Sequence, residues 1–100
     1  MGKVLTRPDS KTKERLKEPE EYKVILLNDN YTSMDFVVMI LMKVFHKNIE
    51  DANRLMLDVH QKGKGIAGIY TWDIALTKAE QVHAIAEANE FPLRCSLEPA

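Results

Sequence analysis

The sequence predicts a small α+β domain whose elements follow one another in the order β-α-α-β-α-β. Three observations predict it: a β-branched apolar run at residues 24–27, helical periodicity in three later segments, and short strand patterns between and after the helices. With 100 residues, 45% of them hydrophobic, the chain is long enough to form one hydrophobic core without disulfides or metals.

The three predicted strands are short and apolar. Val24–Leu27 predicts a buried first strand, and the acceptor-rich residues 28–30 (Asn-Asp-Asn) predict the turn that ends it. Residues 64–70 contain glycines but also two isoleucines and a tyrosine, which favour a second strand. Residues 93–97 predict the third strand, because Phe91-Pro92 ends the preceding element.

The first two helices are predicted at residues 33–45 and 49–62. Thr32 has a carboxylate three residues later, at Asp35, which is typical of a helix start. The core stripe expected for the first helix is Phe36, Val37, Ile40, Leu41 and Val44. The second helix places Ala52, Leu55, Met56 and Val59 on one face, and Gly63 is its predicted C-cap.

The third helix is predicted to begin after Thr71 as its cap and to continue to about Asn89. Its inner face consists of small residues suited to close packing: Ala75, Ala79, Val82 and Ala86. Four further apolar side chains are expected to face outward, and these could form a partner surface: Met39, Met42, Trp72 and Leu76.

Residues 1–20 differ from the rest of the chain, so we expect a flexible arm followed by one domain at residues 21–100. The arm carries six Lys/Arg, four Asp/Glu and two Pro, with almost no apolar periodicity. Such a segment cannot bury enough surface to order itself. It lacks the apolar core of a secretory signal.

Composition argues against several classes of function. The formal net charge of −1 gives no reason to expect binding of nucleic acid, which usually needs a basic surface. The longest apolar run, residues 36–42, is too short to span a bilayer. Cys95 is the single cysteine, which fits a reducing compartment, and its place in a predicted strand indicates a structural thiol.

Three possible catalytic or cofactor motifs lack the context that their chemistry requires. Residues 63–68 spell the dinucleotide fingerprint GxGxxG, but this segment follows a helix and enters a strand, which is the wrong context. A metal site built from Asp29, His60 and His46 lacks the usual ligand spacing. No Ser-His or Cys-His pair has a predicted nucleophile elbow or oxyanion hole.

The turn at residues 28–30 is the strongest candidate for a site. It places hydrogen-bond acceptors at the end of a core strand and directly before an apolar helix. His60 is expected on the edge of the second helix's apolar stripe, near the same rim. Acceptors beside apolar surface suit a cation that is attached to an apolar side chain.

Four segments carry a recognisable pattern, with order and spacing kept from about residue 20 to 98: residues 22–37 (YKVILLNDNYTSMDFV), 55–60 (LMLDVH), 63–65 (GKG) and 87–93 (EANEFPL). In these segments the sequence resembles the ClpS family, the adaptors that bring N-degron proteins to the ATP-dependent Clp protease. The resemblance implies three helices against a three-stranded antiparallel sheet. It also implies a non-enzymatic protein of the bacterial cytoplasm, without metal or cofactor, that binds proteins beginning with Leu, Phe, Tyr or Trp.

The resemblance assigns roles to particular residues. It implies that the substrate's α-amino group is bound by Asn28, Asp29, Asn30 and His60. It implies that the pocket for the substrate's first side chain is lined by Thr32, Met34, Val37, Met56, Val59 and Leu93. Met34 would be a gate at the mouth of this pocket. Asp73 and Lys78 are candidates for contact with the N-terminal domain of the unfoldase ClpA. The resemblance also implies that the N-terminal arm takes part in transferring the substrate. The family usually has a second Asp where this chain has Asn30.

Two other classes of function stay open at this point. A structural or oligomerisation module would use the Met and Trp side chains predicted to face outward and would ignore free amino termini. A small hydrolase would need a nucleophile, and the sequence offers no candidate.

Overall fold

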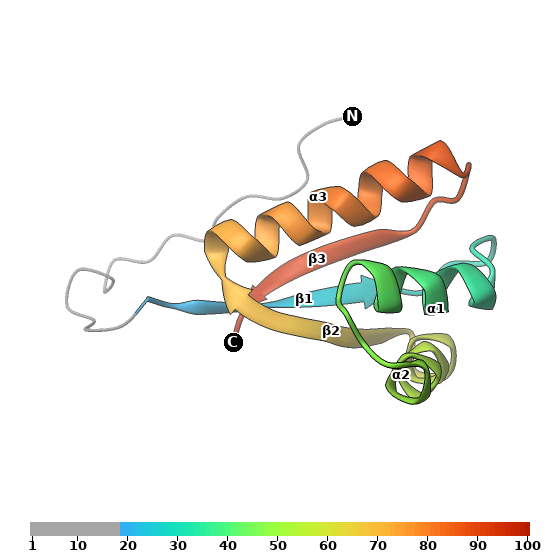
Figure 1. Cartoon of the computed structure of the whole chain (residues 1–100), viewed down its shortest axis with the longest axis horizontal. Helices are drawn as coiled ribbons and strands as arrows, with labels where there is room; N and C mark the ends of the chain where they lie inside the picture. Colours follow the sequence, from blue (N-terminus) through green and yellow to red (C-terminus); the bar gives the residue numbers. More distant parts are fainter. Residues whose placement is uncertain (1–18) are drawn as a thin grey trace.

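The computed structural model describes residues 19–100, which contain three strands and three helices (Figure 1). The elements are β1 (Glu21–Leu27), α1 (Met34–Lys43), α2 (Ile49–Lys62), β2 (Lys64–Thr71), α3 (Trp72–Ala88) and β3 (Arg94–Pro99). The predicted α+β class and the order β-α-α-β-α-β are therefore confirmed. The predicted flexible arm lies outside the described residues, except for Pro19 and Glu20.

The sheet is antiparallel throughout, with β1 between β2 and β3. Successive side chains of a strand point to opposite faces, so Tyr22, Val24 and Leu26 share one face of β1. All three are completely buried. The central strand therefore supplies the middle of the core and ends at the polar turn that precedes α1.

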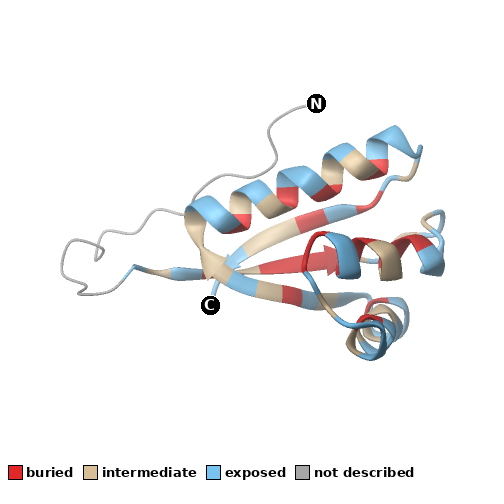
Figure 2. Cartoon of the chain, viewed as in Figure 1, coloured by how far each residue is buried: buried red, intermediate tan, exposed pale blue. Residues whose placement is uncertain are grey.

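The helices bury the faces that their periodicity predicts (Figure 2). In α1 and its C-cap, the predicted stripe from Phe36 to Val44 is buried at every position. In α3, the small-residue face is buried as well, and the helix packs against all three strands. Small side chains let the helix axis approach the sheet closely, which leaves the larger side chains of β1 to fill the space between them.

Two of the four side chains expected to face outward instead pack against the core. Trp72 meets the ring of Tyr22 edge-on at a centroid distance of 5.1 Å, and Met39 also contacts the core cluster. Leu76 is half-buried, and Met42 is exposed as predicted. The prediction was wrong for Trp72 and Met39 because the periodicity of one helix does not show which side chains of other elements pack against it.

The ends of several elements differ slightly from the predictions. The first helix begins one residue later and ends two residues earlier than expected, and β3 runs to Pro99 rather than Leu97. Thr71 is the N-cap of α3 by position, but its side chain makes no capping hydrogen bond. Gly63 is the C-cap of α2 as predicted, with a left-handed φ of 93°.

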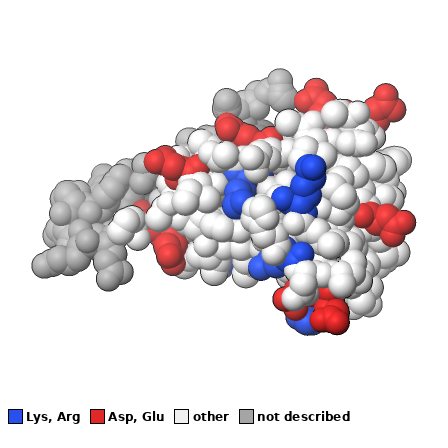
Figure 3. Space-filling model, viewed as in Figure 1, with Lys and Arg blue, Asp and Glu red and all other residues white. Residues whose placement is uncertain are grey.

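The described surface carries charges of both signs. On the face shown in Figure 3, Lys and Arg lie near the middle and Asp and Glu lie around the edge. No helix within residues 19–100 is long and apolar enough to cross a membrane.

Candidate functional site

The turn after β1 is built around the carboxylate of Asp29. Its Oδ1 accepts hydrogen bonds from the backbone N–H groups of Tyr31, at 2.8 Å, and Thr32, at 2.6 Å. Its Oδ2 accepts a third from the hydroxyl of Thr32, at 2.8 Å. Asp is favoured in turns because its side chain can bond the backbone two or three residues ahead. Asp29 therefore fixes the path of the chain between β1 and α1.

The first helix starts at the far end of this turn. Ser33 is its N-cap, and the Ser33 hydroxyl oxygen accepts a hydrogen bond from the backbone N–H of Phe36 at 3.1 Å. The predicted cap, Thr32, lies one residue too early, since its hydroxyl donates to Asp29 instead. Both hydroxyls are thus used to hold the turn.

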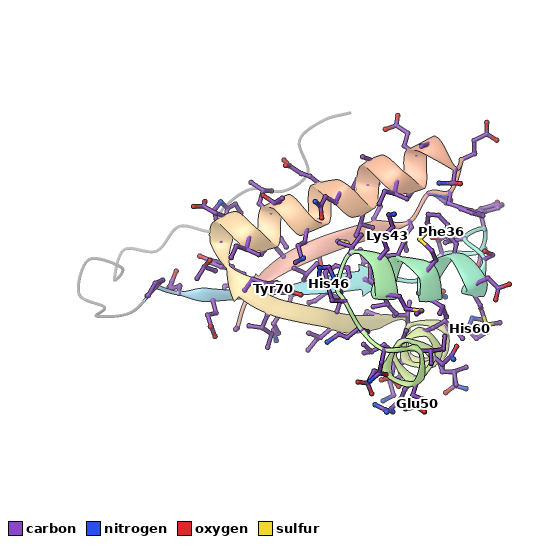
Figure 4. All side chains as sticks on the ribbon, in the orientation of Figure 1. Phe36, Lys43, His46, Glu50, His60 and Tyr70 are labelled. Atoms are coloured by element: carbon purple, nitrogen blue, oxygen red, sulfur yellow. The ribbon has the colours of Figure 1, made fainter. Side chains whose placement is uncertain are left out.

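The second helix meets the turn at its C-terminal end. The backbone N–H of Asn28 donates to the carbonyl of Gly63 at 2.9 Å, which ties the start of the turn to the end of α2. A Cβ added at Gly65 would lie 2.9 Å from Cγ2 of Val59, so this glycine allows the close approach of α2 to β2. His60 follows Val59 and projects toward the end of the molecule where α1 begins (Figure 4).

These elements enclose a cavity of about 380 Å³. Such a volume lies within the range of small-ligand sites. The cavity is lined from the turn, the first turns of α1 and the last turns of α2 by Asn28, Asp29, Asn30, Tyr31, Thr32, Ser33, Met34, Val37, Met56, Val59 and His60. The fold thus brings together every predicted site residue of the amine and side-chain groups except Leu93.

Leu93 does not line the cavity; its side chain is 2% exposed and belongs to the core cluster. Two lining residues were not predicted, Tyr31 and Ser33. Their position inside the same short turn was the signal that could have found them. Tyr31 is 78% exposed, so most of its surface remains open to solvent.

The cavity combines two kinds of surface. Acceptor side chains from the turn and from His60 form one part, and Met34, Val37, Met56 and Val59 form the apolar part. Partial burial raises the pKa of Asp29, but hydrogen bonds from Thr32 and Tyr31 lower it by more, so the net pKa of this carboxyl lies below its usual value. Asp29 is therefore ionised at neutral pH. The arrangement can hold a small cation beside an apolar group.

The two residues predicted to contact an unfoldase lie away from the cavity, near the start of α3. Asp73 is exposed in the first turn of that helix. The ammonium of Lys78 donates to the carbonyl of Val44 at 2.8 Å and lies 5.5 Å from the ring centroid of Tyr70. Lys78 therefore already has a partner within the domain, at the C-terminal end of α1.

Groups typical of metal or nucleophilic chemistry are not gathered near the cavity. Within residues 19–100, no cluster of three or more His, Cys, Asp or Glu side chains could hold a metal ion. Cys95 is buried in β3 as predicted, and burial raises the pKa of its thiol to about 12. A thiol that stays protonated at neutral pH is a poor nucleophile.

Known proteins are similar to this chain in sequence and in fold. Residues 17–96 match the family model of the ATP-dependent Clp protease adaptor protein ClpS. The ATP-dependent Clp protease adapter protein ClpS of Syntrophus aciditrophicus is 59% identical over 85 residues, covering 85% of this chain and 79% of the relative. Its namesake in Acetivibrio thermocellus is 60% identical over 83 residues, covering 83% and 84%.

A solved structure agrees with these relatives. Agrobacterium tumefaciens ClpS2 bound to L-phenylalaninamide superposes with a TM-score of 0.80 at 36% sequence identity, covering 83% of this chain and 100% of that protein. In L-phenylalaninamide a free α-amino group and the phenylalanine side chain are attached to the same carbon. The family match and the high identity over most of the chain show that this protein belongs to the ClpS family of Clp protease adaptors.

Proposed function

We propose that this protein is a non-enzymatic adaptor that binds the free α-amino group and the bulky apolar first side chain of N-degron proteins. The first residues it accepts are Leu, Phe, Tyr and Trp. The observation that carries the proposal is the cavity at the end of β1, in which acceptors from the turn and His60 face a lining of Met and Val side chains. Phenylalaninamide, the ligand of the ClpS2 relative, has an amino group and an apolar side chain that would complement these two kinds of lining residue.

The chemistry of the cavity is sufficient for useful affinity. Each hydrogen bond to a charged group is worth about 1.5–3 kcal/mol, and burial of a Leu or Phe side chain adds about 1.5–3 kcal/mol. A micromolar complex requires about 8 kcal/mol. Two or three amine contacts and one filled pocket reach that value only if the site is preorganised. The hydrogen bonds of Asp29 and the cap at Ser33 supply such preorganisation.

In this proposal the amine lies against Asn28, Asp29, Asn30 and His60, and the first side chain enters between α1 and α2. Met34 is 46% exposed at the start of α1, which suits a gate that closes over the bound side chain. Leu93 lies in the core rather than in the lining, so in the proposal it supports the pocket from beneath.

Peptides that differ only at their amino terminus test the proposal. Leu- and Phe-initiated peptides should bind in fluorescence anisotropy, and their N-acetylated forms should lose about 100-fold or more in affinity, because two or more charge-assisted hydrogen bonds are lost. A Gly-initiated peptide is the control for the side-chain pocket. Equal binding of the free and acetylated peptides would rule out amine recognition.

We further propose that the protein delivers its substrates to the N-terminal domain of ClpA, in the bacterial cytoplasm. Asp73 is the cleaner probe of the proposed contact, because it is exposed whereas Lys78 bonds Val44. Asp73→Ala should weaken binding to ClpA and leave peptide affinity unchanged.

Removal of residues 1–18, which lie outside the described part of the chain, should likewise leave peptide affinity unchanged and should slow degradation by the ClpA–protease complex. Loss of peptide affinity in either variant would contradict this separation.

The alternative of an oligomerisation module has less support. It rested on apolar side chains expected to face outward, and Met39 and Trp72 instead pack against the core. Sedimentation of the purified protein distinguishes the two functions, because an adaptor of this kind needs no self-association to bind a peptide.

A further inference from the structure

We propose that residues 11–17 dock along the outer face of α3, with their Lys and Arg side chains against the carboxylates of that helix. The occupant of this surface is thus a segment of the same chain, and it lies outside the described residues. The surface consists of Asp73, Glu80 and Glu87, and none of these residues lines the cavity at the turn.

The carboxylates of α3 follow a seven-residue spacing. Asp73, Glu80 and Glu87 lie about two turns apart, so they share one side of the helix. All three are exposed, whereas the small-residue face of the same helix is buried. Asp and Glu side chains lie along the edge of the molecule that α3 forms (Figures 1 and 3). The helix therefore presents to solvent a row of negative charge that is about 20 Å long.

The domain itself supplies no cation to this row. Within residues 19–100, both side-chain ion pairs lie on α2: Arg54–Asp51 and Lys62–Asp58. Lys78 is the single basic residue of α3, and its ammonium donates to the carbonyl of Val44. Arg94 of β3 is near enough to His83 to lower its pKa, but it forms no ion pair with a described carboxylate of α3.

The segment that precedes the domain has the opposite charge. Residues 1–18 contain six Lys/Arg and three Asp/Glu, a formal charge of +3, whereas residues 19–100 contain eight and twelve, a formal charge of −4. Four of the six cations occupy alternate positions: Lys11, Lys13, Arg15 and Lys17. Alternate side chains of an extended segment point to the same side. In an extended conformation, residues 11–17 would therefore present a row of cations about 20 Å long.

The described chain begins beside the first carboxylate of the α3 row. Glu21, at the start of β1, pairs with Thr71, which is the N-cap of α3. Asp73 follows two residues later, in the first turn of the helix. An extended chain from residue 11 to residue 20 spans about 30 Å, which is longer than the row of carboxylates. The cations can therefore reach the whole row without any change in the domain.

Each contact is weak, but the segment is tethered. Charges in solvent are screened over about 8 Å at physiological ionic strength, and a single exposed ion pair adds little. A tethered segment meets its surface at an effective concentration in the millimolar range. Several weak pairs together can then keep it docked. Docking of this kind is reversible and decreases as the salt concentration rises.

Docking on α3 also has a consequence for the unfoldase, and this consequence rests on the proposed function. Asp73 belongs both to the row of carboxylates and to the proposed contact with ClpA. A docked segment would cover part of that contact surface. Binding of ClpA at the start of α3 should therefore displace residues 11–17 from the helix.

Zero-length cross-linking of the full chain tests the docking. A carbodiimide joins a lysine ammonium to a carboxylate with which it is in contact, and mass spectrometry identifies the joined peptides. We expect the lysines of residues 11–17 to link to Glu80 and Glu87 about fivefold more often than to Glu50, which is equally exposed on α2. In about 0.5 M NaCl the yield should fall by about fivefold. Equal linking to the two helices, or a yield independent of salt, would overturn the docking.

A charge variant tests the same contact by NMR spectroscopy. Replacement of all four alternating cations by Gln removes the proposed contact without touching the described domain: Lys11→Gln, Lys13→Gln, Arg15→Gln and Lys17→Gln. The amide resonances of residues 73–87 should shift, and those of α2 should not. Lys3→Gln combined with Arg7→Gln is the control, because it removes the other two cations of the same segment. No shift in the fourfold variant, or an equal shift in the control, would contradict docking by residues 11–17.

Addition of the N-terminal domain of ClpA tests the competition. At saturating ClpA, linking of residues 11–17 to α3 should fall by about fivefold. Undiminished linking in the presence of bound ClpA would refute the competition. If ClpA does not bind at all, the proposed delivery is refuted instead, and the linking measured without ClpA still decides the docking.

Discussion

The turn at residues 28–33 and the flank formed by α3 and β3 are held together in opposite ways. In the turn, side-chain hydrogen bonds join residues two or three apart, as between Asp29 and Thr32. The flank has local bonds too, but two of its side-chain hydrogen bonds join residues distant in sequence: Lys78 donates to the carbonyl of Val44, and the backbone N–H of Cys95 donates to Nε2 of His83 at 3.0 Å. The first set shapes a site, whereas the second set joins elements.

This difference indicates how function and stability are divided in the domain. Local bonds can be lost without moving α1 or β1, since both ends of the turn are anchored to large packed elements. Long-range bonds hold edge strand β3 and α1 to α3, so their loss should weaken the whole fold. Changes at the turn should therefore alter peptide affinity, and changes at the flank should alter the free energy of unfolding.

The largest effect is expected for His60→Ala. His60 is exposed, so the free energy of unfolding should change by no more than about 0.5 kcal/mol. If His60 bonds the substrate's ammonium, the loss of that hydrogen bond should lower the affinity for a Leu-initiated peptide by about 10- to 100-fold. Anisotropy and urea unfolding on the same sample measure both quantities, with Gln61→Ala as the neighbouring control. Unchanged peptide affinity would show that His60 takes no part in the site.

The reverse pattern is expected for His83→Ala. This change leaves the Cys95 N–H without its acceptor at the edge of the sheet and should cost about 1–3 kcal/mol of stability. The melting temperature should then fall by about 4–8 °C for each kcal/mol. Peptide affinity should stay within about twofold. A loss of affinity comparable to that of His60→Ala would contradict the division between turn and flank.

A smaller gain is expected for Asn30→Asp. A charged acceptor bonds a cation about twice as strongly as a neutral one, although Asp29 beside it opposes ionisation of a second carboxylate. We expect binding to tighten by about three- to tenfold at pH 7, more at low salt. Asn53→Asp, on the exposed face of α2, adds the same charge outside the cavity as a control. Weaker or unchanged binding would show that Asn30 does not reach the amine.

The smallest effect concerns pH and the flank. Burial and the nearby Arg94 lower the pKa of His83 from its usual value of 6.5, while Glu80 and the bond from Cys95 act in the opposite direction. The unfolded chain therefore binds the proton more readily than the folded protein. Stability should be fully present above pH 6.5 and should decline as the pH falls below it. Urea unfolding between pH 7 and 5 should show this slope in the wild type and lose most of it in His83→Ala.

Sequence reasoning succeeded where a feature depends on neighbours along the chain. The strand at Val24–Leu27, the periodicity of α2 and the glycine cap at Gly63 are all local, and each was predicted correctly, although Leu27 is only half-buried. It failed where packing between distant elements decides. Trp72 is covered because Tyr22 lies beside it, and Leu93 is absent from the cavity lining because the core encloses it. The cap at Ser33 was missed because Asp29 engages the hydroxyl of Thr32 first.

The close contact at Gly65 limits how such a site can diversify. At this position β2 has room for only a hydrogen atom beside the Val59 side chain. Any larger residue there would force the Val59 side chain or the adjoining backbone to shift. Because Val59 also lines the cavity, a substitution at Gly65 would alter the cavity through this side chain. Exchange of a lining side chain such as Met56 changes the shape of the cavity without requiring such a shift.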